Sequence, residues 1–171
     1  MRRIRAGELV LRSVVALALA ALIALIGGMI YVVRAKYALN DYTMQIGLQF
    51  NAAMMVNAHQ THTDEENAVI AEHEGQRAVI APENYRALQA CLLRQAAMPF
   101  MGRVEHEGAL HISVCGVSDL YVQPDEDGEG FTVEFDTGAK RYVMHASGGS
   151  HWQRLVRLCL EGSTKTPNIP L

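Results

Sequence analysis

Three histidines and one glutamate have a spacing that suits a metal site. His59, His62, Glu66 and His73 follow one another at steps of three, four and seven residues. On a continuous helix these steps place all four side chains on one face. Because imidazole nitrogens and carboxylate oxygens bind zinc and other divalent ions, the four residues are candidate metal ligands. No cofactor is expected elsewhere in the chain.

A competing signal lies inside the same stretch. Thr63-Asp64-Glu65-Glu66 has the form of a capping box, in which the threonine bonds the third helical N–H and the last glutamate reaches back. This pattern predicts a new helix that begins at Thr63, runs to about Glu74 and stops at Gly75. A break at Thr63 would separate the first two histidines from Glu66 and His73. The alternative to a metal site is therefore a solvated polar face.

The segment Asp136-Thr137-Gly138-Ala139 follows an apolar stretch with strand-like alternation. With the residues before it, Val-Glu-Phe-Asp-Thr-Gly-Ala resembles the active-site segment of retroviral-type aspartic proteases. In that family the aspartates of two copies share a proton and activate water, so the resemblance implies that role for Asp136. Only 32 residues follow Ala139, and they contain a helical pattern in place of the family's bracing segment. The alternative is a tight hairpin turn, which Asp, Thr and Gly favour.

The acidic run Asp125 to Gly130, with Asp136 in the twelfth place, resembles the calcium loop of EF-hand proteins. That family places oxygen ligands at positions one, three, five and twelve and glycine at position six. This chain departs from the pattern with a bulky Glu129 at position five, an aspartate at position twelve, and strands in place of flanking helices. The alternative is a solvated acidic hairpin tip.

The chain has three cysteines, Cys91, Cys115 and Cys159. An odd number permits at most one internal disulfide, and whether one forms is left open. Cys91 lies near Leu88 and Leu92 at helical spacing, and Cys159 has similar apolar neighbours. We therefore expect Cys91 and Cys159 to be buried as small hydrophobic residues.

An apolar run near the N-terminus determines the expected topology. Between Arg12 and Arg34 lie 21 residues, Ser13 to Val33, without a charged side chain. At about 1.5 Å per residue, a helix of this length spans about 30 Å, the thickness of a bilayer's hydrocarbon core. Residues 1–36 carry a net charge of +5, whereas residues 37–171 carry −8. Since basic flanks tend to stay cytoplasmic, we expect a single-pass cell-membrane protein with a cytoplasmic N-terminus and an extracytoplasmic C-terminal domain.

The alternative for this run is a cleaved signal peptide. Val33-Arg34-Ala35 loosely fits a small-x-small cleavage site. The apolar run is longer than the roughly 7–15 residues that signal peptides use, which favours an uncleaved anchor. The domain is exported under either interpretation. Its acidic charge argues against a nucleic acid partner, because phosphates demand a basic face.

Small residues recur within the expected span. Ala16, Ala20, Ala24 and Gly28 are four residues apart, which makes a stripe along which two helices can approach closely. The expected partners are the lipid bilayer, a second copy through this stripe, and a protein of unknown identity.

The elements that position these residues form an α+β fold. We expect a cytoplasmic N-terminus (1–12), a transmembrane helix (13–33) that continues into a stalk helix (34–62), an α+β domain (63–162) and a loose tail (163–171).

Steps of three and four from Leu39 to Met54 place an apolar stripe of the stalk against the domain. A strand at 78–80 and a helix at 82–97 follow. The period then changes to two, which predicts an antiparallel meander with strands near 110–115, 120–122, 131–135 and 141–145. A helix from Ser150 to Gly162 is expected to cover the apolar face of this sheet.

Together these patterns favour a non-catalytic binding or assembly component of the cell envelope. The alternative is an exported metal-dependent or hydrolytic enzyme that uses the histidine set or Asp136.

Overall fold

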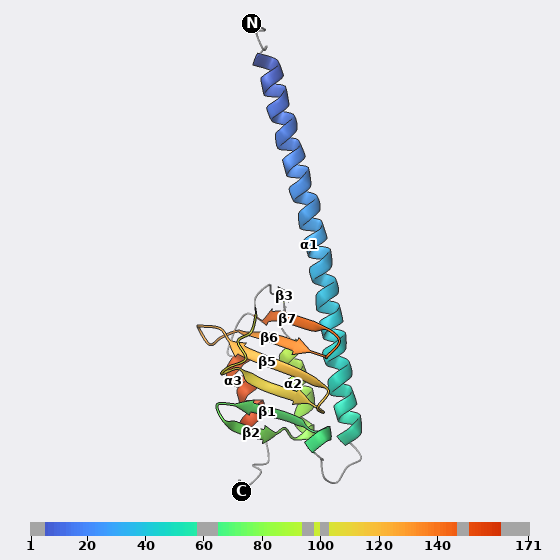
Figure 1. Ribbon diagram of the computed structural model, residues 1–171, viewed down its shortest axis with the longest axis vertical. Helices are drawn as coiled ribbons and strands as arrows, with labels where there is room; N and C mark the ends of the chain where they lie inside the picture. The colour runs from blue at the N-terminus through green and yellow to red at the C-terminus, as the bar shows by residue number, and fades with distance from the viewer. Residues whose placement is uncertain (1–5, 58–64, 94–97, 100–102, 147–150, 162–171) are drawn as a thin grey trace. The chain divides into compact units, whose positions relative to one another are not determined.

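The computed structural model describes residues 6–57, 65–93, 98–99, 103–146 and 151–161. The chain divides into two compact units, Met1–Tyr37 and Ala38–Leu171. Helix α1 (Ala6–Asn57) belongs to both, because it runs through the boundary without a break (Figure 1). The predicted continuation of the apolar helix into a second helical segment is therefore confirmed. Residues 58–62 of the expected stalk lie outside the described residues.

The first unit is the apolar half of α1. Every side chain from Leu11 to Arg34 is exposed, including all the large aliphatic residues of the uncharged run. The most apolar window of this helix has a mean hydropathy of 2.6, so the helix is long and apolar enough to cross a membrane. In water these side chains would have nothing to bury them.

The second unit is built on one antiparallel sheet. Among the described residues the strands lie in the order β2-β1-β4-β5-β6-β7-β3, and every neighbouring pair is antiparallel. Their bounds are Val69–His73 (β1), Gln76–Val79 (β2), Met98–Pro99 (β3), Leu110–Val114 (β4), Ser118–Pro124 (β5), Phe131–Asp136 (β6) and Arg141–Ala146 (β7). The sheet confirms the α+β class and the antiparallel meander.

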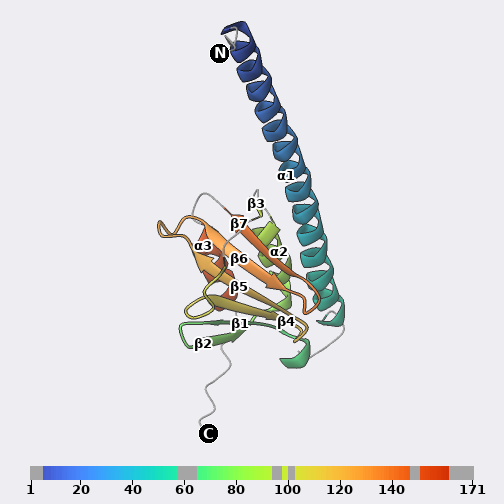
Figure 2. The same ribbon diagram turned by 45° about the horizontal axis from the view of Figure 1, so that its top comes forward.

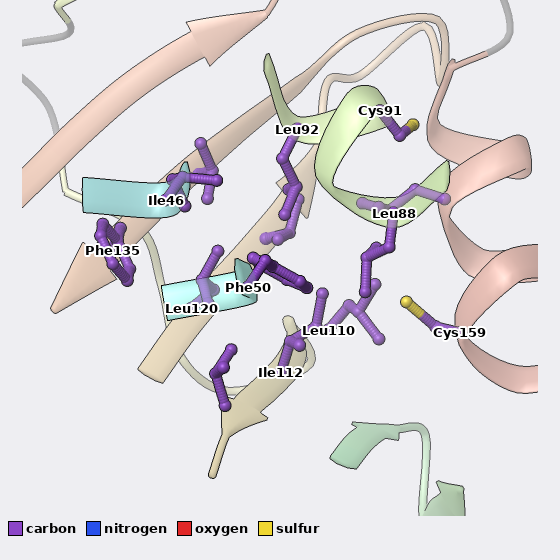
Figure 3. Packing of buried hydrophobic residues seen from close by; sticks show 14 of the residues in the cluster. Ile46, Phe50, Leu88, Cys91, Leu92, Leu110, Ile112, Leu120, Phe135 and Cys159 are labelled. Atoms are coloured by element: carbon purple, nitrogen blue, oxygen red, sulfur yellow. The ribbon is translucent and has the colours of Figure 1, made fainter. Parts of the chain in front are cut away.

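Helices cover one face of this sheet (Figures 1 and 2). They are the C-terminal part of α1, then α2 (Tyr85–Leu93) with its leading 3-10 turn η2 (Pro82–Asn84), and α3 (His151–Val156) with the π-helical turn η3 (Arg157–Glu161). Figure 3 shows Phe50 of α1 packed between Leu88 of α2 and Leu120 of β5. Tyr42, Ile46 and Phe50 are fully buried, as the spacing in the second half of α1 predicts. Burial of each such side chain contributes about 1.5–3 kcal/mol.

The helix predicted from Thr63 to Glu74 is wrong. Glu65–Asn67 forms only a 3-10 turn (η1), and residues 69–73 form strand β1. Val69 and Ala71 are buried in the core, whereas the alternate residues Ile70 and Glu72 are half-buried and exposed, respectively. Glu74 and Gly75 then adopt φ values of 49° and 75°, the two positive values that a type I′ hairpin turn requires. Pairing with β2 and β4 thus overrides the local capping signal.

Other boundaries differ less. The helix expected over 82–97 is described to Leu93, and residues 94–97 lie outside the described residues. Met98–Pro99 adds a short edge strand, β3, that the sequence did not predict. The strand at 78–80 and the four meander strands agree with β2, β4, β5, β6 and β7. The C-terminal helix is confirmed as a covering element, with Leu155 and Cys159 fully buried.

Candidate functional site

The face of the sheet turned away from the helices, here called the outer face, carries a row of aligned polar side chains. Arg77 lies opposite Glu72, Glu72 opposite His111, His111 opposite Tyr121, and Tyr121 opposite Glu134. The row therefore crosses β2, β1, β4, β5 and β6 in a single line. Side chains directly opposite one another in antiparallel strands have Cβ atoms about 4.5–5.5 Å apart, so all five can interact.

An aromatic stack lies in the middle of this row. The ring of Tyr121 is parallel to that of His106, with 3.8 Å between centroids and 5° between planes. His111 stacks with the same phenol at 4.7 Å and 12°. His106 comes from the segment before β4, so this segment folds over the outer face at Tyr121. No helix among the described residues covers this face.

One hydrogen bond, to Asp119, and one longer contact, with Glu72, orient the imidazole of His111. Its Nε2 lies 2.8 Å from an oxygen of Asp119, and its Nδ1 lies 3.9 Å from an oxygen of Glu72. Glu72 in turn accepts from Arg77 Nε at 3.0 Å. The ring is thereby held between two carboxylates on neighbouring strands.

Glu134 is the buried charge of the outer face, with only 2% of its surface exposed. One carboxylate oxygen lies 3.1 Å from His106 Nε2, and the other accepts a hydrogen bond from Arg141. A buried carboxylate persists only when it is paired and hydrogen-bonded. Glu134 therefore ties the segment that carries His106 to strands β6 and β7.

Tyr121 is a neutral phenol on this face, stacked with both histidines. Partial burial raises the pKa of its phenol above the ordinary value of 10.0, and the carboxylates of Asp119, Glu134 and Asp136 raise it further. The phenol therefore keeps its proton at neutral pH, as it would also do at the ordinary value, and remains uncharged.

A cavity of about 580 Å³ opens beside the aromatic stack. Its walls include Glu72, Glu74 and Arg77 of the β1–β2 hairpin, together with His106 and Tyr121. A second cavity, of about 440 Å³, lies on the other side of the same hairpin against α3 and η3. Both volumes fall in the range of about 300–1,000 Å³ that is typical of ligand pockets.

The structure does not bring the predicted metal ligands together on one helix. Glu66 is exposed on η1, and His73 lies at the end of β1 with its ring edge against Trp152, 5.6 Å between centroids. His59 and His62 lie outside the described residues. Within the described ranges, no group of three or more His, Cys, Asp or Glu side chains is arranged to hold a metal ion. Metal binding by the four residues stays a prediction.

The two motif resemblances fall on hairpin turns. Asp136 accepts a hydrogen bond from the Gly138 N–H at 2.7 Å, and Thr137 bonds Lys140, so this segment closes the β6–β7 turn. The acidic run that starts at Asp125 forms the β5–β6 turn, in which the Gly128 N–H donates a hydrogen bond to the Asp125 carbonyl. Asp136 lies at the far end of β6 from that run, so it does not complete a calcium loop.

The remaining predicted residues are placed as follows. No disulfide joins the three cysteines, and Cys91 and Cys159 are buried as expected. Burial raises the pKa of both thiols. Ala16, Ala20, Ala24 and Gly28 are exposed on α1, and a Cβ added at Gly28 would meet nothing within 4 Å. Self-association through this stripe stays a prediction.

Comparisons of the chain with protein-family models, with curated proteins and with solved structures find no match.

Proposed function

We propose that this chain is a single-pass membrane protein whose exported α+β domain binds a protein partner through the outer face of its sheet. The anchor is the first half of α1, and the basic residues before it keep the N-terminus in the cytoplasm. The domain is a non-catalytic component of the cell envelope.

The observation that carries this proposal is the outer face, which no described helix covers and whose central side chains are held by mutual contacts. An antiparallel sheet with one solvated face normally shows polar side chains there at alternate positions. Here His106, Tyr121 and His111 are stacked, and carboxylates on both sides hold the imidazoles. Side chains that are already fixed lose little rotamer entropy on association, which favours binding.

Crosslinking in cells tests this proposal. A photoreactive phenylalanine analogue replaces Val143, which continues the row beyond Glu134 and is half-buried on the same face. The control is the same analogue at exposed Arg86 of α2, on the helical side of the sheet. We expect light to give one discrete adduct from position 143 and none from position 86. Equal labelling from both positions, or none from position 143, contradicts the proposal.

A further inference from the structure

We propose that the partner inserts an arginine side chain into the cavity between the β1–β2 hairpin and the segment that carries His106. This inference rests on the proposed function, since it specifies the chemistry of the segment that the outer face binds. It follows from three properties of the cavity: its residual charge, its exposed ring and its size.

The negative charges that line the cavity outnumber the positive ones. Arg77 pairs with Glu72, and Arg141 pairs with Glu134. Glu74 also lines the cavity, and it forms no ion pair with any residue in the described part of the chain. With its histidines neutral, the cavity keeps one net negative charge, because two carboxylates, Glu72 and Glu74, and one guanidinium, Arg77, line it. Complementarity of charge selects a cationic group on the partner.

The rings distinguish one cation from another. One face of the His106 imidazole lies on Tyr121, and half of the side chain remains exposed toward solvent. A planar guanidinium stacks on such a ring and at the same time donates paired hydrogen bonds to a carboxylate. An ammonium group offers a point charge and cannot stack. The combination of a ring with the Glu74 carboxylate therefore favours arginine over lysine.

The size of the cavity admits a side chain carried on a peptide. A volume of about 580 Å³ exceeds what one guanidinium needs and leaves room for the backbone that bears it. The second strand of this hairpin, β2, is one of the two edge strands of the sheet. An edge strand has unpaired N–H and C=O groups, so an extended segment can approach along it.

The probe for this proposal is N-acetyl-arginine methylamide, titrated into the full-length protein in lipid nanodiscs. NMR signals of His106 and Tyr121 report occupancy. We expect these signals to shift in a saturable manner, with weaker binding of the lysine analogue and no binding of the uncharged citrulline analogue. Glu74→Gln is expected to weaken arginine binding about two- to fivefold, as loss of one exposed charge pair does. Glu83→Gln on η2, outside the cavity, is the matched control and leaves binding unchanged.

Two results overturn the inference. One is citrulline binding as strongly as arginine, and the other is an affinity unchanged by Glu74→Gln. Crosslinking separates this failure from failure of the proposed function. If the adduct from position 143 keeps its full yield in the Glu74→Gln protein, the face binds a partner without this arginine contact. If the parent protein gives no adduct from position 143, the proposed function itself fails.

Discussion

At the scale of single residues, Glu134 and Arg141 are unequal members of one ion pair. The Glu134 side chain is 3% exposed, whereas that of Arg141 is 45% exposed. Removal of the arginine leaves a buried carboxylate with only His106 as a partner, whereas removal of the glutamate releases an arginine that water can solvate. The two substitutions should therefore lower the free energy of unfolding by different amounts.

We expect Arg141→Ala to lower the free energy of unfolding by about 1–3 kcal/mol, the cost of an unsatisfied buried polar group. Glu134→Met should cost less, because it removes the buried charge along with the ion pair. Denaturant unfolding of the full-length protein in detergent, followed by tryptophan fluorescence, measures both. Arg86→Ala, at an exposed position on α2, serves as the control for loss of a surface arginine. An equal effect of Arg141→Ala and Arg86→Ala would show that Glu134 does not depend on this partner.

Asp41 gives the domain an acid-dependent contact between α1 and the β6–β7 turn. The hydrogen bond from Lys140 lowers the pKa of Asp41 below its ordinary value of 3.8; partial burial opposes this effect, and the Tyr142 hydroxyl adds to it. A folded-state pKa below the unfolded value means that this contribution to stability is fully present above pH 3.8. It is lost as the pH falls through the lowered pKa.

Asp41→Asn is therefore expected to lower the melting temperature at pH 7, with the difference from the parent protein shrinking below pH 3.8. Thermal unfolding by circular dichroism at a series of pH values measures this difference. Glu83→Gln, on the exposed η2 turn, controls for the loss of one negative charge. A difference that stays constant down to pH 2 would mean that the carboxylate charge of Asp41 does not stabilise the fold.

At the scale of elements, the sequence pattern placed a strand correctly where its local periodicity and its tertiary packing agree. The apolar residues of β4, β5 and β6 alternate, and each strand was placed within a few residues. The pattern failed at β1, because its partner β4 lies about forty residues further along the chain, as in the pair Ala71 and Ile112. A capping-box signal acts locally and carries no information about such a pair.

The outer-face site was not predicted from the sequence for a related reason. Alternation shows that His111, Tyr121 and Glu134 share the polar side of their strands. Register decides which of them lie opposite one another, and a shift of one residue would turn each side chain to the other face. His106 lies outside any strand, so its contact with Tyr121 had no sequence signal.

The β1–β2 turn carries a testable strain. Glu74 has φ 49°, in the left-handed region, which costs a non-glycine residue roughly 1–2 kcal/mol. Glu74→Asn should raise the free energy of unfolding by up to about 1 kcal/mol, because asparagine accepts this conformation more readily. Gly75→Ala, at φ 75°, should lower it by about 1 kcal/mol. Denaturant unfolding of both variants provides the measurement. Effects of the same sign would refute the type I′ geometry.

At the scale of the whole molecule, the two units differ in charge and in apolar exposure. The first is basic, and its helix exposes its aliphatic side chains. The second is acidic and buries most of its large apolar side chains in one core. This asymmetry is the pattern expected of a membrane anchor joined to an exported domain.

The small-residue stripe predicts self-association in the bilayer. Ala20→Ile together with Ala24→Ile should reduce dimers several-fold, since bulky side chains prevent close approach of the helix backbones. Leu19→Ile together with Ile23→Leu is the matched control, because it changes side-chain shape on neighbouring positions without adding bulk. Chemical crosslinking in native membranes measures the dimer fraction. Equal dimer yields in both variants would remove the stripe as the contact surface.

The anchor itself yields the broadest prediction. Insertion of a charge near the middle of the span, as in Leu22→Arg, costs about 2.5–3.5 kcal/mol on insertion scales, so a large fraction of this variant should leave the membrane on alkaline carbonate extraction. The parent protein and Leu22→Phe should stay in the membrane pellet. Protease added to intact cells should digest a C-terminal tag and leave an N-terminal tag protected, because a basic flank favours the cytoplasmic side of a membrane. Release of the parent protein into the soluble fraction would exclude an anchor, whereas digestion of the N-terminal tag alone would reverse the orientation and place the outer face in the cytoplasm.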